Sequence, residues 1–178
     1  DFSIVVDKAI SIDIPTNQYN DGHISSVVLD SMSNIFVSLS LGYGDDYSII
    51  QKYNSDLDLI WSLDLDGSAR MLKTKNNQLY VSGKEQYSVP NNGDFVAKIG
   101  SETGSLIWYN NIGEAPNSNG ALLEINDQFI VYTRCHSVSN SGPGTYIHIF
   151  DDDTGDYDTY NINYYEIVKD VALDNNTL

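Results

Sequence analysis

A hairpin pattern that recurs three times constrains the fold of this chain more than any other feature. Each copy combines an alternating strand, a polar turn and a return strand that carries one large aromatic residue. The copies cover residues 94–111, 47–64 and 145–161. Trp108, Trp61 and Tyr160 are the aromatic residues of these copies, in that order. Three copies of one hairpin predict a repeat protein.

A second hairpin recurs between the copies of the first. Each copy has an apolar strand, a turn containing Asn or Asp, and a strand with a central valine. These copies cover residues 25–40, 69–83 and 120–133. Aligned on Val37, Val81 and Val131, they repeat at intervals of 44 and 50 residues, and the aromatic residue of the first hairpin repeats at 47 and 52. Four-stranded propeller blades repeat every ~40 to 50 residues, so the sequence predicts an all-β propeller with almost no helix.

The repeats divide a single predicted domain, residues 1–178, into blades. We expect three complete blades and two half-blades at the termini. The complete blades are placed at about residues 25–67, 68–113 and 114–164, and the half-blades at residues 1–16 and 165–178. Three alternatives remain for the halves. They join within one chain and close a four-bladed ring, they belong to a longer propeller of which this chain is a piece, or they pair between subunits head to tail.

Two of the turns resemble those of a known family. The segments IGSETGSLIW (residues 99–108) and FDDDTGDYDTY (residues 150–160) resemble pyrroloquinoline-quinone-like (PQQ-like) β-propeller repeats, in which Asp and Thr-Gly precede a tryptophan. Residues 53–61 keep the tryptophan but lose the Thr-Gly. The resemblance implies a propeller, but such repeats occur in dehydrogenases, assembly factors and adhesive surface proteins. Quinoproteins of this kind carry adjacent cysteines, and this chain has one cysteine, so no quinone and no other organic cofactor is expected.

The charge of the chain restricts its partners. There are 25 acidic and 9 basic residues, a formal net charge of -16. Such a surface repels nucleic acid and anionic membrane. The lone cysteine, Cys135, allows no intrachain disulfide, and no apolar run approaches the ~20 residues of a membrane helix. An acidic chain rich in Ser, Asn and Tyr is typical of an extracellular or cell-surface module.

An acidic turn in the third repeat is the one candidate metal site. Asp151, Asp153, Asp156 and Asp158 bring carboxylates close together around Gly155, and calcium takes several oxygen ligands. The spacing is not that of an EF-hand. A solvated hairpin turn, which selects the same residue types, is the favoured alternative.

The remaining candidate residues carry weaker signals. Asn175 begins the Asn-Asn-Thr sequence at residues 175–177, a possible glycan acceptor. The histidines have no ligand at a zinc-binding spacing, and His148 is expected to point outward or toward a neighbouring blade. The recurring aromatic residues could stack on sugars, but a common address in each repeat favours packing between blades.

Two functions of different class follow. The preferred one is a non-catalytic secreted or surface scaffold that acts through protein contacts and self-association, since the sequence has no nucleophile elbow and no phosphate-binding loop. The alternative is a fragment of a larger propeller enzyme, quinoprotein-like or glycan-processing, with its catalytic residues outside this chain.

Overall fold

The computed structural model describes residues 22–42, 47–85, 93–114, 118–125, 130–136 and 144–162. This part of the chain contains twelve β-strands and no helix, so the all-β prediction is confirmed. Accordingly, no helix within these ranges is long and apolar enough to cross a membrane.

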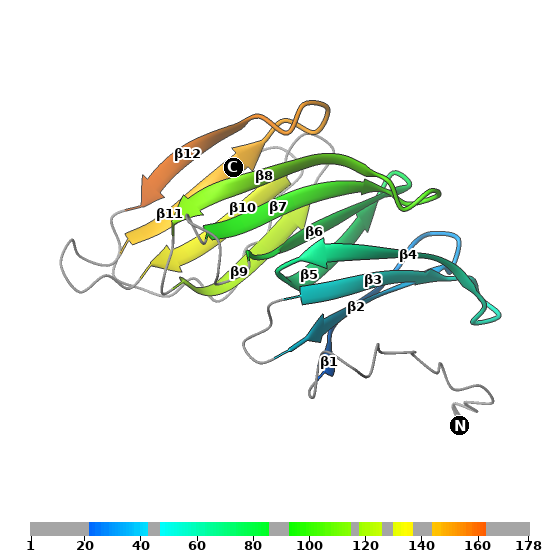
Figure 1. The fold of residues 1–178 in the computed structure, drawn as a ribbon. Helices are drawn as coiled ribbons and strands as arrows, with labels where there is room; N and C mark the ends of the chain where they lie inside the picture. The colour runs from blue at the N-terminus through cyan, green and yellow to red at the C-terminus, as the bar shows by residue number, and fades with distance from the viewer. Residues whose placement is uncertain are drawn as a thin grey trace, which may run out of the picture.

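The strands form three antiparallel sheets of four strands each, and every sheet follows chain order (Figure 1). Sheet 1 contains β1 (Gly22–Leu29), β2 (Ile35–Leu41), β3 (Tyr47–Tyr53) and β4 (Leu59–Asp66). Sheet 2 contains β5 (Ser68–Lys75), β6 (Gln78–Lys84), β7 (Gly93–Gly100) and β8 (Leu106–Glu114). Sheet 3 contains β9 (Ser118–Ile125), β10 (Ile130–His136), β11 (Gly144–Phe150) and β12 (Tyr157–Ile162). The two predicted half-blades, residues 1–16 and 165–178, lie outside the described residues.

Tight turns keep consecutive strands antiparallel. Lys75 pairs with Gln78 across a two-residue turn, in which Asn76 and Asn77 have φ angles of 48° and 57°. A type I′ turn needs positive φ at both central residues, and asparagine tolerates that conformation. The wider turn between β7 and β8 uses Gly104 at φ 69°.

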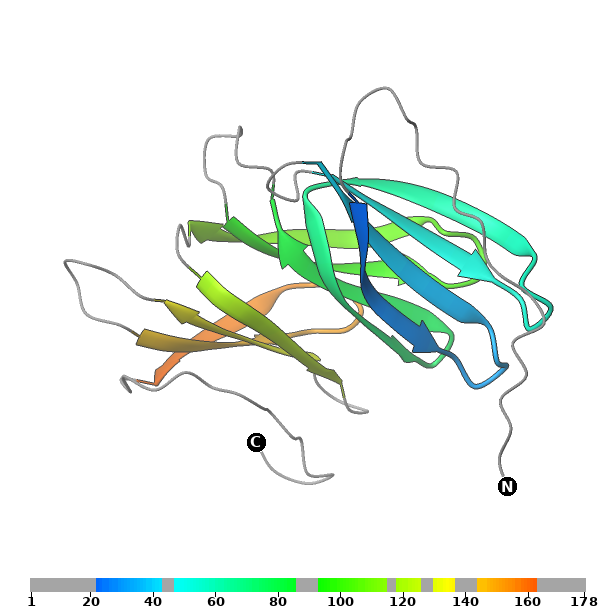
Figure 2. The same ribbon diagram turned by 90° about the horizontal axis from the view of Figure 1, so that it is seen from below.

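Sheet 2 lies between the other two sheets, and the three follow one another across the molecule (Figures 1 and 2). The first strand of each sheet makes the closest approach: β5 contacts β1, β2 and β3, and β9 contacts β5 and β6. We call the side of a sheet that faces its successor the forward face and the opposite side the backward face. The joint between sheets 1 and 2 buries Phe36, Ile50, Leu79, Val81, Phe95, Ala97 and Ile99. The joint between sheets 2 and 3 buries Tyr80, Val96, Trp108 and Phe150.

Alternation explains both joints. Successive side chains of a strand point to opposite faces. In β6, Leu79 and Val81 therefore face backward while Tyr80 faces forward. Sheet 2 is apolar on both faces because it is covered on both.

The strand registers correct one alignment made from the sequence. Ile35, Leu79 and Ile130 each pair with the residue just before the outer hairpin turn of their sheet. Val37 and Val81 follow Ile35 and Leu79 by two residues, so they are equivalent. The residue two places after Ile130 is Tyr132, which is therefore the third member of this set. The alignment on Val131 is wrong by one residue, because an apolar residue recurs at both places and pattern alone does not fix register.

Buried serines tie sheet 1 to the start of β5. The Ser48 hydroxyl donates to the Gly67 carbonyl oxygen at 2.8 Å and accepts from the Ala69 N–H at 2.7 Å. The Ser38 hydroxyl donates to the Ala69 carbonyl oxygen at 2.7 Å. These bonds satisfy backbone groups where the chain passes from sheet 1 into sheet 2. They therefore fix the start of β5 against sheet 1.

Candidate functional site

In the described structure, tryptophan and lysine side chains form hydrogen bonds and ion pairs across the joints between the sheets. At the first joint, Trp61 Nε1 of β4 donates to the carbonyl oxygen of Ser101, in the β7–β8 turn, at 2.9 Å. Its indole covers Gly104, where an added Cβ would lie 2.8 Å from Trp61 Cδ2. Lys52 Nζ reaches Glu102 of the same turn at 3.2 Å. One tryptophan and one lysine of sheet 1 therefore hold the turn of sheet 2.

The second joint repeats this arrangement one sheet later. Trp108 Nε1 donates to the carbonyl oxygen of Asp152 at 3.0 Å, and its indole covers Gly155, with an added Cβ 2.8 Å from Trp108 Cδ2. Lys98 Nζ contacts both the carboxylate and the carbonyl oxygen of Asp152 at 2.8 Å. Trp61 and Trp108 thus occupy equivalent surroundings, which the repeat interpretation requires.

A β-bulge places each tryptophan on the forward face. In sheet 2, Ile99 pairs with Leu106 but Lys98 pairs with Trp108, so Ile107 is the extra residue. Sheet 1 has the same irregularity beside Trp61, where Ile60 is extra. Such a bulge shifts the following residues to the other face, so the lysine and the tryptophan point the same way.

Sheet 3 has no bulge here, and its aromatic residue differs. Tyr160 pairs with Ile147 in unbroken register and is 53% exposed, so it does not share the position of the two tryptophans. The residue three positions after the turn, where sheets 1 and 2 have tryptophan, is Thr159. Its side chain points to the backward face, where its hydroxyl lies 2.9 Å from His148 Nδ1. The expected equivalence of Tyr160 with Trp61 and Trp108 is therefore wrong.

Of the two orientations predicted for His148, outward or toward a neighbour, the structure has the side chain face the neighbouring sheet. The alternation of β11 places it opposite Ile147 and Ile149, and the side chain is buried. It lies on the backward face of sheet 3, with its ring against Tyr146 and Tyr157.

Two tyrosines at the joints have strongly shifted pKa values. Burial raises the pKa of Tyr80, and its hydrogen bond to Asp152 with the charges of Asp152 and Asp153 raises it further. Burial and a hydrogen bond to Glu85 raise the pKa of Tyr109. Both hydroxyls donate to carboxylates, at 2.7 Å and 2.8 Å, and therefore act as structural donors.

The candidate calcium turn is organised by its own backbone. The Asp151 carboxylate accepts from the N–H groups of Asp153 and Thr154 and from the Thr154 hydroxyl. The bonds from Thr154 hold the pKa of Asp151 below its usual value. Asp153, Asp156 and Asp158 are exposed, and no group of three acidic, histidine or cysteine side chains within the described residues is placed to hold a metal. The structure thus does not gather these carboxylates into a ligand set, and calcium binding stays a prediction.

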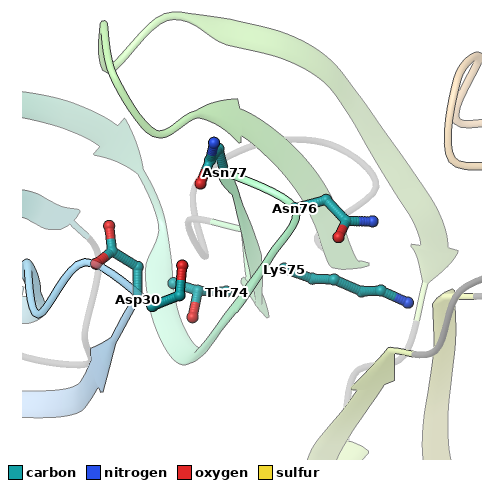
Figure 3. A pocket seen from close by; sticks show the side chains of 6 residues that line it. Asp30, Thr74, Lys75, Asn76 and Asn77 are labelled. Carbon is teal, nitrogen blue, oxygen red and sulfur yellow. The ribbon is translucent and has the colours of Figure 1, made fainter.

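A small pocket lies between the β1–β2 and β5–β6 turns (Figure 3). Asp30 stands on one side and Asn76 and Asn77 on the other, while the Lys75 side chain extends away from Asp30. Partial burial raises the pKa of Asp30, but hydrogen bonds from Asn34 and Met32 and the nearby charge of Lys52 bring it below its usual value. The pocket measures about 100 Å³. That volume holds a few waters and is below the ~300 Å³ of a typical ligand site.

The docking lysines and glycines are the residues that sequence reasoning missed. Lys52 and Lys98 are buried near the ends of strands that are otherwise largely apolar, two residues before a turn. Both lysines occupy the same position in their hairpins, and this recurrence is the sequence signal that could have identified them. Asn175 lies outside the described residues.

The sequence matches no known family model and no curated protein. The resemblance to PQQ-like repeats therefore rests on the turn motifs themselves.

Proposed function

We propose that this chain is a β-propeller scaffold, secreted or displayed at a cell surface, that works through protein–protein contacts and associates with itself head to tail. The observation that carries the proposal is the repeated joint, in which a lysine and a tryptophan of one sheet hold the turn of the next. Because this joint has the same direction each time, the row of sheets can be extended by the sheets of a further copy.

The propeller arrangement is supported by which strands approach one another. In a propeller, the first strands of successive blades crowd around an axis and the last strands diverge. Here β1, β5 and β9 belong to the strand pairs in closest contact between sheets. The complete blades of this proposal are the three sheets, and residues 1–16 and 165–178 supply the half-blades.

The non-catalytic character is supported by the roles of the perturbed groups. Shifted pKa values mark many catalytic residues, but ion pairs and turns shift them as well. Tyr80 and Tyr109 are donors at the joints, and Asp30 and Asp151 each accept N–H groups of their own turns. Each of these four groups thus has a structural partner, and for the two tyrosines burial adds to the effect of that partner on the pKa.

Sedimentation velocity of the native protein at several concentrations tests the proposal. We expect species larger than one chain, with a share that rises with concentration. A much longer native polypeptide that stays monomeric would contradict the proposal and favour the enzyme alternative.

Cell fractionation tests the location separately. The protein should appear in the medium or on the surface of intact cells, where an added protease digests it. Recovery only from the cell interior contradicts a secreted or surface scaffold.

A further inference from the structure

The first strand of sheet 1 presents an apolar surface that its counterpart in sheet 2 buries. Ile24, Val27 and Leu29 are 56%, 54% and 59% exposed. In β5, Ala69 and Leu72 are at most 3% exposed. Three large apolar side chains side by side on one strand are more than isolated surface residues.

The registers establish that these positions are equivalent. Val27 pairs with Val37, and Leu72 pairs with Val81, the matching residue of sheet 2. Both first strands carry a bulge at the same place, after Ile24 in β1 and after Ala69 in β5. Ile24 and Val27 therefore stand where Ala69 and Leu72 stand in the next sheet.

What covers the β5 positions is the preceding first strand. The Leu72 N–H donates to Ser26 Oγ at 3.1 Å, and the Thr74 hydroxyl donates to the Leu29 carbonyl oxygen at 2.8 Å. The contact is made by the forward face of β1. By the same rule, the surface formed by Ile24, Val27 and Leu29 accepts the forward face of another first strand.

The β2 and β3 parts of the same face are already buried. Val37, Leu39 and Ile49 point to the backward side of sheet 1 and are at most 6% exposed. The face is open again at β4, where Leu59 and Ser62 are exposed, but the buried strip of β2 and β3 separates β4 from β1. The open apolar area at β1 is therefore one strand wide and suits one strand of the first-strand type.

Residues 167–173 have the sequence of such a strand. This segment, IVKDVAL, lies outside the described residues and follows β12 along the chain as β5 follows β4 and β9 follows β8. In both precedents the strand after a sheet packs on the forward face of that sheet. If the same precedent holds after β12, residues 167–173 would offer a forward face of this type.

Sheets 1 and 3 lie at opposite ends of the row of sheets (Figure 1). A surface at one end and its complement at the other make a heterologous contact, which joins copies head to tail. We propose that Ile24, Val27 and Leu29 of one copy seat residues 167–173 of a second copy. This inference rests on the self-association in the proposed function and names the surface and the segment that carry it.

Charge substitutions in the full chain test the surface. Val27→Asp places a carboxylate where an apolar strand should seat, and we expect the dissociation constant of self-association to rise at least about tenfold. Val171→Asp should do the same from the other side. Leu106→Asp is the matched control, since Leu106 is an apolar residue 48% exposed on β8 of sheet 2, and it should leave association unchanged. Circular dichroism confirms that each variant keeps its sheets.

Disulfide trapping then identifies the occupant. A Val27→Cys chain is mixed with a mass-tagged Val171→Cys chain under oxidation, and we expect the mixed dimer. Self-association that is unaffected by Val27→Asp overturns this inference and leaves the proposed function standing. A monomer in which both cysteines of a double variant join within one chain overturns the second copy in favour of a closed ring. A monomer that shows neither overturns both proposals.

Discussion

At the scale of single residues, the two glycines of the joints decide whether the sheets can dock. Gly104 and Gly155 adopt positive φ angles of 69° and 78°, and each lies under an indole ring. The equivalent residue in the β3–β4 turn is Leu57, with a φ of 64°. Among the three turns β3–β4, β7–β8 and β11–β12, glycine occupies this position only in the two that receive a tryptophan, so it is needed for space as well as conformation.

Gly104→Ala should lower the free energy of unfolding by about 2–4 kcal/mol, from a strained positive φ and from a Cβ too close to Trp61. Urea unfolding measures the loss. A double-mutant cycle with Trp61→Phe separates the causes, because a smaller ring relieves the clash but not the strain. If the two changes were simply additive, the indole would not be the obstacle.

The raised pKa of Tyr80 predicts loss of stability at alkaline pH. In the unfolded chain, tyrosine ionises near pH 10, but in the folded protein Tyr80 keeps its proton to higher pH. The contribution of Tyr80 to the free energy of unfolding is therefore complete below pH 10 and decreases as the pH rises above 10. Tyr80→Phe should be less stable at pH 7, by about 1–2 kcal/mol for the lost hydrogen bond, and should lose less stability between pH 9 and 11. Equal alkaline losses in both proteins, measured by urea unfolding, would contradict this assignment.

At the scale of elements, sheets 1 and 2 are joined in two ways. Serine hydroxyls bind the connection between the sheets, and a tryptophan binds the turn of the second sheet. Ser48 holds the connection between β4 and β5, and Trp61 holds the β7–β8 turn. Both sets bind backbone atoms, so each sheet positions the main chain of the next. The bulges in β4 and β8 are part of this joint, because they turn the tryptophans forward.

Ser48→Ala should lower the free energy of unfolding by about 1–3 kcal/mol, since it leaves the buried N–H of Ala69 without its acceptor. Ser62→Ala on the exposed side of β4 is the matched control and should change it by less than about 0.5 kcal/mol. Thermal and urea unfolding measure both. Equal effects of the two substitutions would show that the buried serine does not hold the joint.

At the scale of the whole molecule, the net charge of -16 opposes compactness and association. Salt screens this repulsion over about 10 Å at 0.1 M. The melting temperature and the associated fraction should both rise as NaCl increases. Calcium chloride at equal ionic strength should have the same effect as NaCl, because Asp151 is occupied by its own turn and the other turn carboxylates are exposed. A rise specific to calcium, reversed by a chelator, would instead establish the site at Asp151, Asp153, Asp156 and Asp158.

The sequence by itself determined the strands and the hairpins that join them. Alternation of apolar residues and the turn residues at Asn76 and Asn77 are local features, so they can be read without the fold. The likeness of Trp61 and Trp108 also followed from spacing, and their shared surroundings agree with it.

Only the tertiary structure decided register, face and burial. A bulge shifts side chains to the opposite face without changing composition, so spacing alone groups Tyr160 with the tryptophans. The alignment on Val131 fails for another reason, because apolar residues occupy both neighbouring places and pattern does not fix register. Burial depends on what the neighbouring sheet covers, so the sequence left both orientations of His148 open and did not show the role of Lys98. The exposed side chains of Ile24, Val27 and Leu29 follow from the same cause, since a strand becomes a surface or a core only when its neighbours are in place.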